Sequence, residues 1–297
     1  MTAPTPVRTL PVAPVPRVRE ITLDADGITL SGLYAEPDGM RAPRAVIVAV
    51  HGRGMRAGYF HGGAHPDASL LALATRLGHP VLALDRPGYG LSARQLPMGQ
   101  PLAEQAVTVR AALATYAEQY DIGAGYFLLA HSYGGKLALQ LAAGDRDNSL
   151  VGMDISGMGR DYAPEAYGFP ASLADGAFRL NWGPMRLYPP GTFRAARRLM
   201  TPTPDREEHE RLPPWPVRFP RLAADVRVPV RLTFAEHEIW WRTDDASLAS
   251  LAGQFTAAPR VRVDREPAAG HNISMGHAAR AYHLRALAFL EDCLRAA

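Results

Sequence analysis

The chain has 297 residues, of which 47% are hydrophobic, so it can bury the core of a single α/β domain with an insertion. Its formal net charge is +3, and all but one of its 32 basic residues are arginine; none forms the basic block or helix stripe typical of nucleic-acid binding. The single cysteine, Cys293, excludes an intrachain disulfide and a cysteine-rich zinc site.

The N-terminal segment is rich in proline and has no continuous apolar stretch of the kind found in a signal peptide or a membrane anchor. The longest apolar runs are only as long as a strand, as in Ala45–Val50. We therefore interpret residues 1–17 as a flexible arm. We expect a soluble, cytoplasmic protein that has neither a nucleic acid nor a membrane as its partner.

The first elements in chain order are strands. Val18–Leu23 and Ile28–Ala35 flank Asp26-Gly27, which indicates a β-hairpin. Ala45–Val50 is uniformly apolar, which is typical of a strand buried on both faces in a parallel sheet. Helices and strands then alternate through 66–77 (helix), 81–84 (strand), 102–120 (helix), 126–130 (strand), 135–143 (helix) and 150–155 (strand).

This alternation breaks between residues 158 and 227, which are rich in proline and too long for a simple connection. Short helices are possible at Ser172–Phe178, Phe193–Leu199 and Asp205–Arg211. Strand and helix patterns resume at 228–234, 245–255, 261–263 and 277–294. We predict a doubly wound, mostly parallel α/β sheet formed by 18–157 and 228–297, with 158–227 inserted as a helical cap.

The strongest chemical signal is Ala130-His131-Ser132-Tyr133-Gly134, which fits the pattern G-x-S-x-G with alanine in the first glycine position. Such a motif joins a strand to a helix through a strained turn that exposes the serine hydroxyl, and small neighbours allow the chain to pass close to itself. An apolar strand before Ser132 and a helix after it supply the expected context. An ordinary strand–helix turn is the alternative.

With these residues the sequence resembles the α/β-hydrolase superfamily from about residue 18 onward. Three further segments match in order: the oxyanion segment His51-Gly52-Arg53-Gly54, the loop Asp85–Ser92, and Ala269-Gly270-His271-Asn272, which corresponds to the segment with the catalytic histidine. The resemblance implies the fold and a serine nucleophile, without a cofactor or a metal ion. The histidines at 51, 61 and 65 lack the spacing of a metal site.

A serine hydroxyl requires a base within hydrogen-bond distance, and that base requires an orienting acid. Among ten histidines we select His271, because it follows the last strand and so lies at the same sheet edge as Ser132. His277 and His283 fall in or beside the last helix. We expect His131 to point away from the site, since neighbouring strand residues diverge, and His51 to shape the oxyanion segment.

The acid is chosen from the segment Leu232–Glu238. The resemblance places Glu238 in the position of the acid, and the order Ser132, Glu238, His271 agrees with the order in this fold. Glu236 is the main rival, and Asp154, inside a strand, is a weaker one. A solvated loop carboxylate is the alternative explanation for Glu238.

The oxyanion of the tetrahedral intermediate requires backbone N–H donors. We assign one to Tyr133, at the start of a helix whose dipole favours an anion, and the second to Arg53 in the glycine-rich segment. The Arg53 side chain could instead line the entrance or lie in solvent.

Substrate contacts are predicted from aromatic residues. Trp182, Trp215 and Trp241 could line an apolar acyl pocket together with Trp240, or they could simply pack the cap onto the core. A group of arginines could contact an anionic substrate or a carrier protein, although a solvated helix face explains them more simply; these are Arg194, Arg197 and Arg198.

The predicted function is hydrolysis of an ester or thioester of a medium-sized organic molecule through an acyl-enzyme. Two alternatives use the same scaffold: cleavage of a C–C bond or off-loading of a polyketide-like chain, and a haloperoxidase-like side activity. A non-catalytic binding protein of the same fold is a third alternative, although a binder has no need of the Ser132, Glu238 and His271 set. Specificity lies in the cap and loops, which fold analogy does not transfer.

Overall fold

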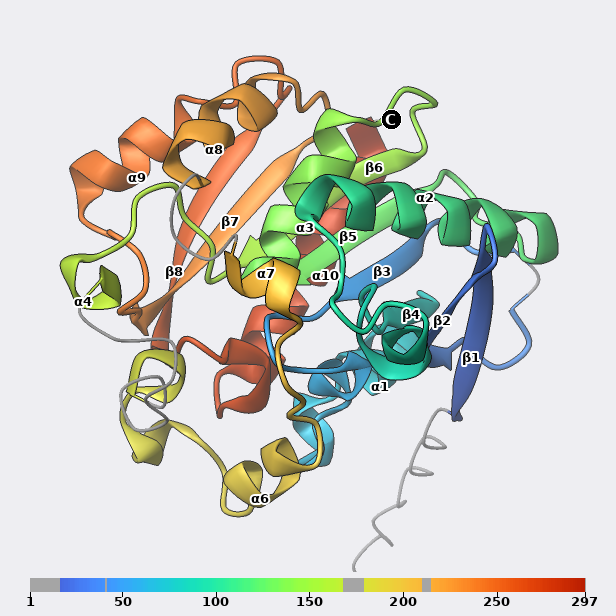
Figure 1. Cartoon of the computed structure of the whole chain (residues 1–297), viewed down its shortest axis with the longest axis horizontal. Helices are drawn as coiled ribbons and strands as arrows, with labels where there is room; N and C mark the ends of the chain where they lie inside the picture. Colours follow the sequence, from blue (N-terminus) through green and yellow to red (C-terminus); the bar gives the residue numbers. More distant parts are fainter. Residues whose placement is uncertain (1–16, 41, 168–178, 210–214, 297) are drawn as a thin grey trace, which may run out of the picture.

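The computed structural model describes residues 17–40, 42–167, 179–209 and 215–296. Its centre is an eight-stranded sheet in the order β1-β2-β4-β3-β5-β6-β7-β8 (Figure 1). The strands are β1 (Val18–Ala25), β2 (Ile28–Ala35), β3 (Val46–Val50), β4 (Val81–Leu84), β5 (Tyr126–His131), β6 (Leu150–Ser156), β7 (Val230–His237) and β8 (Val261–Gly270).

The sheet is antiparallel only at the edge that contains the N-terminal hairpin. β1 pairs with β2 and β2 with β4 in antiparallel fashion, whereas every pair from β4 to β8 is parallel. Crossover connections between parallel strands place helices on both faces. This arrangement confirms the predicted doubly wound, mostly parallel sheet.

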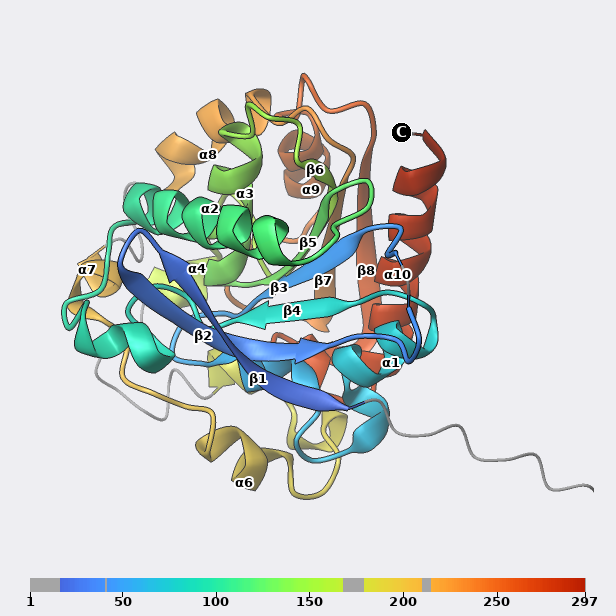
Figure 2. The ribbon, with the colours of Figure 1, turned by 90° about the vertical axis from the view of Figure 1, so that its right-hand side faces the viewer.

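Helices cover both faces of the sheet. The described α-helices are α1 (Leu70–Arg76), α2 (Leu102–Gln119), α3 (Tyr133–Ala143), α4 (Pro164–Tyr167), α6 (Thr192–Arg197), α7 (Asp205–His209), α8 (Trp215–Ala224), α9 (Asp245–Ala252) and α10 (Ala279–Ala296). Short 3-10 helices are η1 (Ala57–His61), η2 (Pro66–Ala68), η3 (Gly90–Arg94), η4 (Met185–Leu187) and η5 (Ile273–Met275). In Figure 2, α2, α3 and α8 lie on one side of the sheet and α1 and α10 on the other.

Strand alternation explains how one sheet supports two cores. In β5, Tyr126 and Leu128 pack into the core under α2 and α3, while Phe127 and Leu129 pack into the core under α1 and α10. All six residues of this strand are buried, because a central parallel strand is covered on both faces. The uniformly apolar strand sequences are the direct result of this double coverage.

The observed element boundaries differ slightly from the expected ones. The helix expected at 66–77 is divided, because Ser69 caps a new helix through a 3.1 Å bond from Ala72 N to its hydroxyl. β8 continues to Gly270, well beyond the apolar run 261–263. Its polar residues are tolerated because β8 is an edge strand, paired only with β7.

The segment between β6 and β7 contains the helices α4, α6, α7 and α8, consistent with a helical insertion. The helix expected at Ser172–Phe178 lies outside the described residues. α8 packs against α3 on the body of the sheet rather than over its edge. No described helix combines the length and the apolar character that crossing a membrane requires.

Candidate active site

Ser132 occupies a strained turn between β5 and α3. Its backbone angles are φ 53° and ψ −120°, a conformation that non-glycine residues rarely adopt. The turn is tight: a Cβ atom on Gly134 would lie 2.3 Å from the carbonyl oxygen of Val50. Only glycine fits there, so β3 and the start of α3 can touch. This geometry presents the Ser132 side chain at the carboxyl edge of the sheet, as the motif requires.

A chain of hydrogen bonds joins Ser132, His271 and Glu238. Ser132 Oγ lies 3.0 Å from His271 Nε2, and His271 Nδ1 lies 2.8 Å from Glu238 Oε2. Since a carboxylate only accepts hydrogen bonds, Nδ1 carries the proton and Nε2 is left to accept from the serine hydroxyl. The side chains of His271 and Glu238 are 3% and 0% exposed, so water does not compete for their contact.

The structure separates the three candidate acids. Glu238 points to His271, and its other oxygen accepts hydrogen bonds from the backbone N–H groups of Ile239 and Trp240 at 3.1 and 2.9 Å. Glu236 is exposed and accepts from Ala268 N at 2.7 Å instead. Asp154 is buried and forms an ion pair with Arg231 instead of contacting His271. Of the three, only Glu238 contacts the imidazole.

His131 does not lie where the sequence placed it. Its ring centroid is 4.8 Å from that of His271 and 4.8 Å from that of Tyr59, on which it stacks. The expectation that it points away from the site is therefore wrong. Strand alternation itself holds, because His131 continues the face of Phe127 and Leu129 and stacks on Tyr59 in the same core; the loop after β8 brings His271 to that face. Burial is the main cause that lowers the pKa of His131 well below its usual value, and the nearby His271 lowers it further. His131 is therefore a neutral ring where it packs against His271.

The two residues assigned to the oxyanion both face the serine. Tyr133 is the first residue of α3, where backbone N–H groups have no partner within the helix. Arg53 follows β3, and Gly52 beside it packs so closely that a Cβ atom there would lie 3.2 Å from Ser132 Cβ. Arg53 and Tyr133 line the same cavity as Ser132. Their placement agrees with the prediction, while their role belongs to the proposal below.

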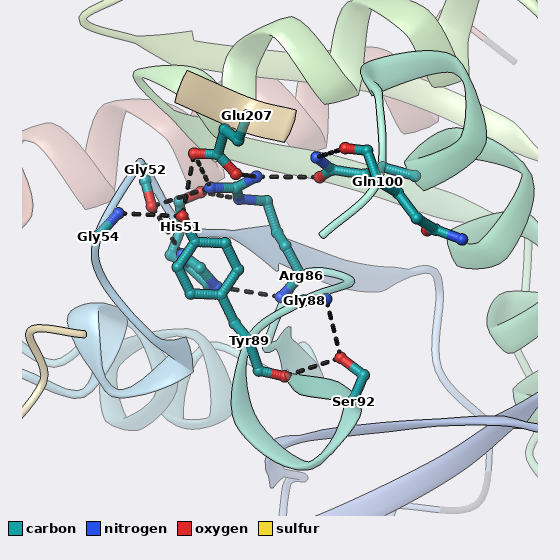
Figure 3. A network of polar contacts seen from close by, with 10 residues as sticks. His51, Gly52, Gly54, Arg86, Gly88, Tyr89, Ser92, Gln100 and Glu207 are labelled. Carbon is teal, nitrogen blue, oxygen red and sulfur yellow. Dashed lines mark hydrogen bonds and ion pairs between the residues drawn. The ribbon is translucent and has the colours of Figure 1, made fainter. Parts of the chain in front are cut away.

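A buried ion pair supports the segment that contains Arg53. Figure 3 shows Arg86, in the loop after β4, facing Glu207 of α7. Two bonds of 2.8 and 3.0 Å join them, and neither side chain is exposed. The same guanidinium donates to the carbonyl oxygens of His51 at 2.9 Å and Gly52 at 3.3 Å. Arg86 thereby connects the inserted helix α7 to the oxyanion segment.

Further contacts hold this network in place. The Tyr89 hydroxyl donates to Glu207 at 3.0 Å and accepts from Gly54 N at 3.2 Å (Figure 3). His51 Nε2 accepts from the backbone N–H of Arg86 at 3.0 Å, which confirms that His51 shapes this segment. Burial lowers its pKa to about 3. Sequence reasoning noted the Asp85–Ser92 loop but missed its partner Glu207, which lies over 100 residues away.

The cavity beside Ser132 has a volume of about 50 Å³. It is lined by aromatic, basic and polar side chains, namely Arg53, Ser132, Tyr133, Lys136, Tyr162, Asn181, Trp240 and Trp241. Trp241 is therefore placed as expected, next to Trp240, whose indole N–H donates to Asn181 at 2.9 Å.

The other two tryptophans expected to bind substrate do not line this cavity, which corrects that part of the prediction. Trp182 packs edge-on against Tyr188 and Phe193, with ring centroids 5.1 Å from each. Trp215 is buried with Phe219 on α8, and its indole N–H donates to Gly159 at 2.8 Å. Both are packing residues, the alternative that the sequence left open. No group of His, Cys, Asp and Glu side chains within the described part of the chain could hold a metal ion.

Comparisons with known proteins agree with this architecture. An enol-lactonase from Burkholderia xenovorans LB400 superposes with a TM-score of 0.68 at 17% identity, covering 91% of this chain and 100% of that one. An esterase from Mycobacterium tuberculosis superposes with a TM-score of 0.63 at 18% identity, covering 94% of this chain and 92% of that one. The thioesterase domain from the curacin biosynthetic pathway superposes with a TM-score of 0.60 at 16% identity, covering 91% of this chain and 99% of that one.

At these identities the structural matches show the fold alone. No curated protein matches the sequence significantly. The profile of the alpha/beta hydrolase family, however, matches residues 47–283, which include the serine turn, both glutamates and His271. The chain belongs to the alpha/beta hydrolase family.

Proposed function

We propose that this hydrolase is a serine esterase or thioesterase that cleaves a medium-sized organic substrate through an acyl-enzyme. The hydrogen-bonded chain from Ser132 through His271 to Glu238 is the observation that supports it most directly. A buried imidazole with its Nδ1 proton held by a carboxylate is suited to remove a proton from serine.

In the proposed reaction, Ser132 Oγ attacks the carbonyl carbon and its proton passes to His271 Nε2. The carbonyl oxygen becomes an anion, which the backbone N–H groups of Tyr133 and Arg53 stabilise. His271 then gives the proton to the leaving alcohol or thiol. Water attacks the acyl-enzyme and gives one proton to Nε2. His271 then passes this proton to Ser132 Oγ as the bond between Oγ and the acyl carbon breaks, so the acid product leaves and both side chains return to their starting states.

Labelling with a fluorophosphonate tests the proposal. We expect the wild-type protein to be labelled and to hydrolyse simple esters or thioesters, and Ser132→Ala to lose both properties while its thermal unfolding is preserved. Ser250→Ala, an exposed serine on α9, is the matched control and should react like wild type. If the folded wild-type protein is neither labelled nor active on a panel of esters and thioesters, the chain is a non-catalytic member of its family.

A further inference from the structure

Asn181 brings a polar side chain of the insertion to the cavity beside Ser132. It lies between α4 and η4, is half-buried, and lines this cavity. Its side-chain oxygen Oδ1 accepts a hydrogen bond from Trp240 Nε1 at 2.9 Å. Because an indole N–H group only donates, this contact fixes which end of the carboxamide is the oxygen. The amide nitrogen Nδ2 then lies at the other end, where no residue within the described part of the chain accepts from it.

The backbone of Asn181 is bonded to the loop that contains His271. Its carbonyl oxygen accepts from the backbone N–H of Asn272 at 3.2 Å and from Asn272 Nδ2 at 2.9 Å. The two segments pack closely, since a Cβ atom on Gly270 would lie 2.2 Å from the carbonyl oxygen of Trp182. Because Asn272 directly follows His271, these contacts restrict the movement of Asn181 relative to the imidazole.

Trp240, which holds the carboxamide, is itself held in place. Its backbone N–H donates to Glu238 at 2.9 Å, and its ring centroid lies 6.3 Å from that of His271. Asn181 is thus bonded to both loops from which we propose that the acid and the base come. A donor that is held in place before the substrate arrives loses little conformational entropy on binding, so a single hydrogen bond can contribute to selectivity.

The cavity leaves room for a small substrate group beside this donor. Its volume of about 50 Å³ and its place next to Ser132 suit a group of a few heavy atoms close to the reacting carbon. A substrate group that fills this space displaces water from Nδ2. If the group has no acceptor, the donor is left unsatisfied and affinity is lost, whereas an oxygen that accepts from Nδ2 avoids this loss.

We infer that Asn181 Nδ2 donates a hydrogen bond to an oxygen of the substrate, so that the enzyme prefers esters with an ether or carbonyl oxygen a few bonds from the scissile carbonyl. This inference rests on the proposed hydrolase function, and it narrows the substrate class to oxygenated esters. Asn181 is a specificity-determining residue, whereas Ser132 and His271 perform the proposed reaction.

The preference is measured with pairs of esters in which an ether oxygen replaces a methylene group. Methyl 3-methoxypropanoate is compared with methyl pentanoate for the acyl side, and 2-methoxyethyl acetate with butyl acetate for the alcohol side. Each kcat/KM is divided by the rate constant of alkaline hydrolysis of the same ester, which removes differences in intrinsic reactivity. We expect wild type to favour the ether by at least about threefold in one of the pairs, the effect of one net hydrogen bond between uncharged groups.

Two variants locate the effect at Asn181. Asn181→Asp keeps the oxygen that accepts from Trp240 and replaces Nδ2 with a carboxylate oxygen, which only accepts, so the ratio of kcat/KM between ether and methylene esters should fall to one or below. Asn181→Leu has a similar size without either polar atom and should lose the preference as well. Asn148→Asp is the matched control, because it introduces the same charge at an exposed position before β6, outside the cavity, and it should keep the wild-type ratio.

The outcomes separate this inference from the proposed function. Wild-type protein that is labelled at Ser132 but shows no preference for either ether, or cleaves none of the four esters, would overturn the inference and leave the reactive serine in place. A preference that persists in the folded Asn181 variants would assign the hydrogen bond to another donor and also overturn it. Folded protein that is neither labelled nor active would remove the basis of both.

Discussion

At the scale of single residues, two glutamates two positions apart have different surroundings. Glu238 is buried against His271, while Glu236 is exposed and contacts only backbone nearby. The acid contributes a large factor to catalysis because it fixes the tautomer of the histidine. An amide in its place can offer an N–H group where the imidazole needs an acceptor. Which glutamate can serve as the acid therefore depends on where its side chain points, since the residue type is the same.

The exchange of each glutamate for glutamine tests this difference. Glu238→Gln should lower kcat for ester hydrolysis at least 100-fold, since the Nδ1 proton of His271 loses its charged acceptor. Glu236→Gln should change it less than about threefold. Steady-state kinetics with one ester decide between them, and the reverse ranking would reassign the acid to Glu236.

At the scale of elements, α7 forms ion pairs in very different surroundings, of which two are described by the structure. Glu207 contacts Arg86 in complete burial, and Arg86 in turn holds His51 and Gly52 of the oxyanion segment. Arg206, the neighbouring residue on α7, pairs with Glu104 of α2 at 3.7 Å, and both side chains are more than half exposed. Burial decides how much the loss of one partner lowers the stability of the fold, because water replaces an exposed partner at little cost.

We predict that Glu207→Gln lowers the free energy of unfolding by about 3–5 kcal/mol, because it leaves the Arg86 charge buried without a counter-charge. It should also lower kcat, since the segment with Arg53 loses part of its support. Glu104→Gln is the matched control, with an expected loss below about 1 kcal/mol. Urea denaturation measures both; equal losses in the two variants would show that the buried pair has no special role.

At the scale of the whole molecule, several buried histidines make folding sensitive to acid. Burial lowers the pKa of His51 and of His283 each to about 3, and lowers that of His131 well below its usual value. In the unfolded chain a histidine titrates near 6.5. Between these values the unfolded state binds protons that the folded state does not, so stability falls as the pH drops below about 6.5.

His283 offers a test in which the catalytic groups are untouched. It is fully buried on α10, where Nε2 contacts Ser274 Oγ at 3.0 Å. When the pH falls from 7.5 to 5, the free energy of unfolding should decrease by about 2 kcal/mol less in His283→Phe than in wild type. The reason is that the variant lacks one histidine that binds a proton in the unfolded chain and not in the folded one. The same substitution at the exposed His277 should leave the wild-type pH dependence in place. Identical pH dependence of wild type and His283→Phe would contradict the assignment.

Local patterns in the sequence predicted most of the fold and the central part of the site. The apolar strands, the alternation with helices, and the small residues around Ser132 each follow from contacts within a few positions along the chain. The choice of His271 also followed from local order, because a loop after a strand in a parallel sheet returns to the same edge. These features depend on periodicity and backbone geometry, which short segments already encode.

Only the tertiary structure decided which distant side chains meet. It placed His131 beside His271, joined Arg86 to Glu207, and left Trp182 and Trp215 outside the cavity that Trp241 lines. Such contacts depend on how helices of the insertion pack onto the sheet, and no local pattern determines that packing. The sequence by itself determined the scaffold and the residues that we propose to react, whereas three-dimensional packing determined their supports and which side chains line the cavity.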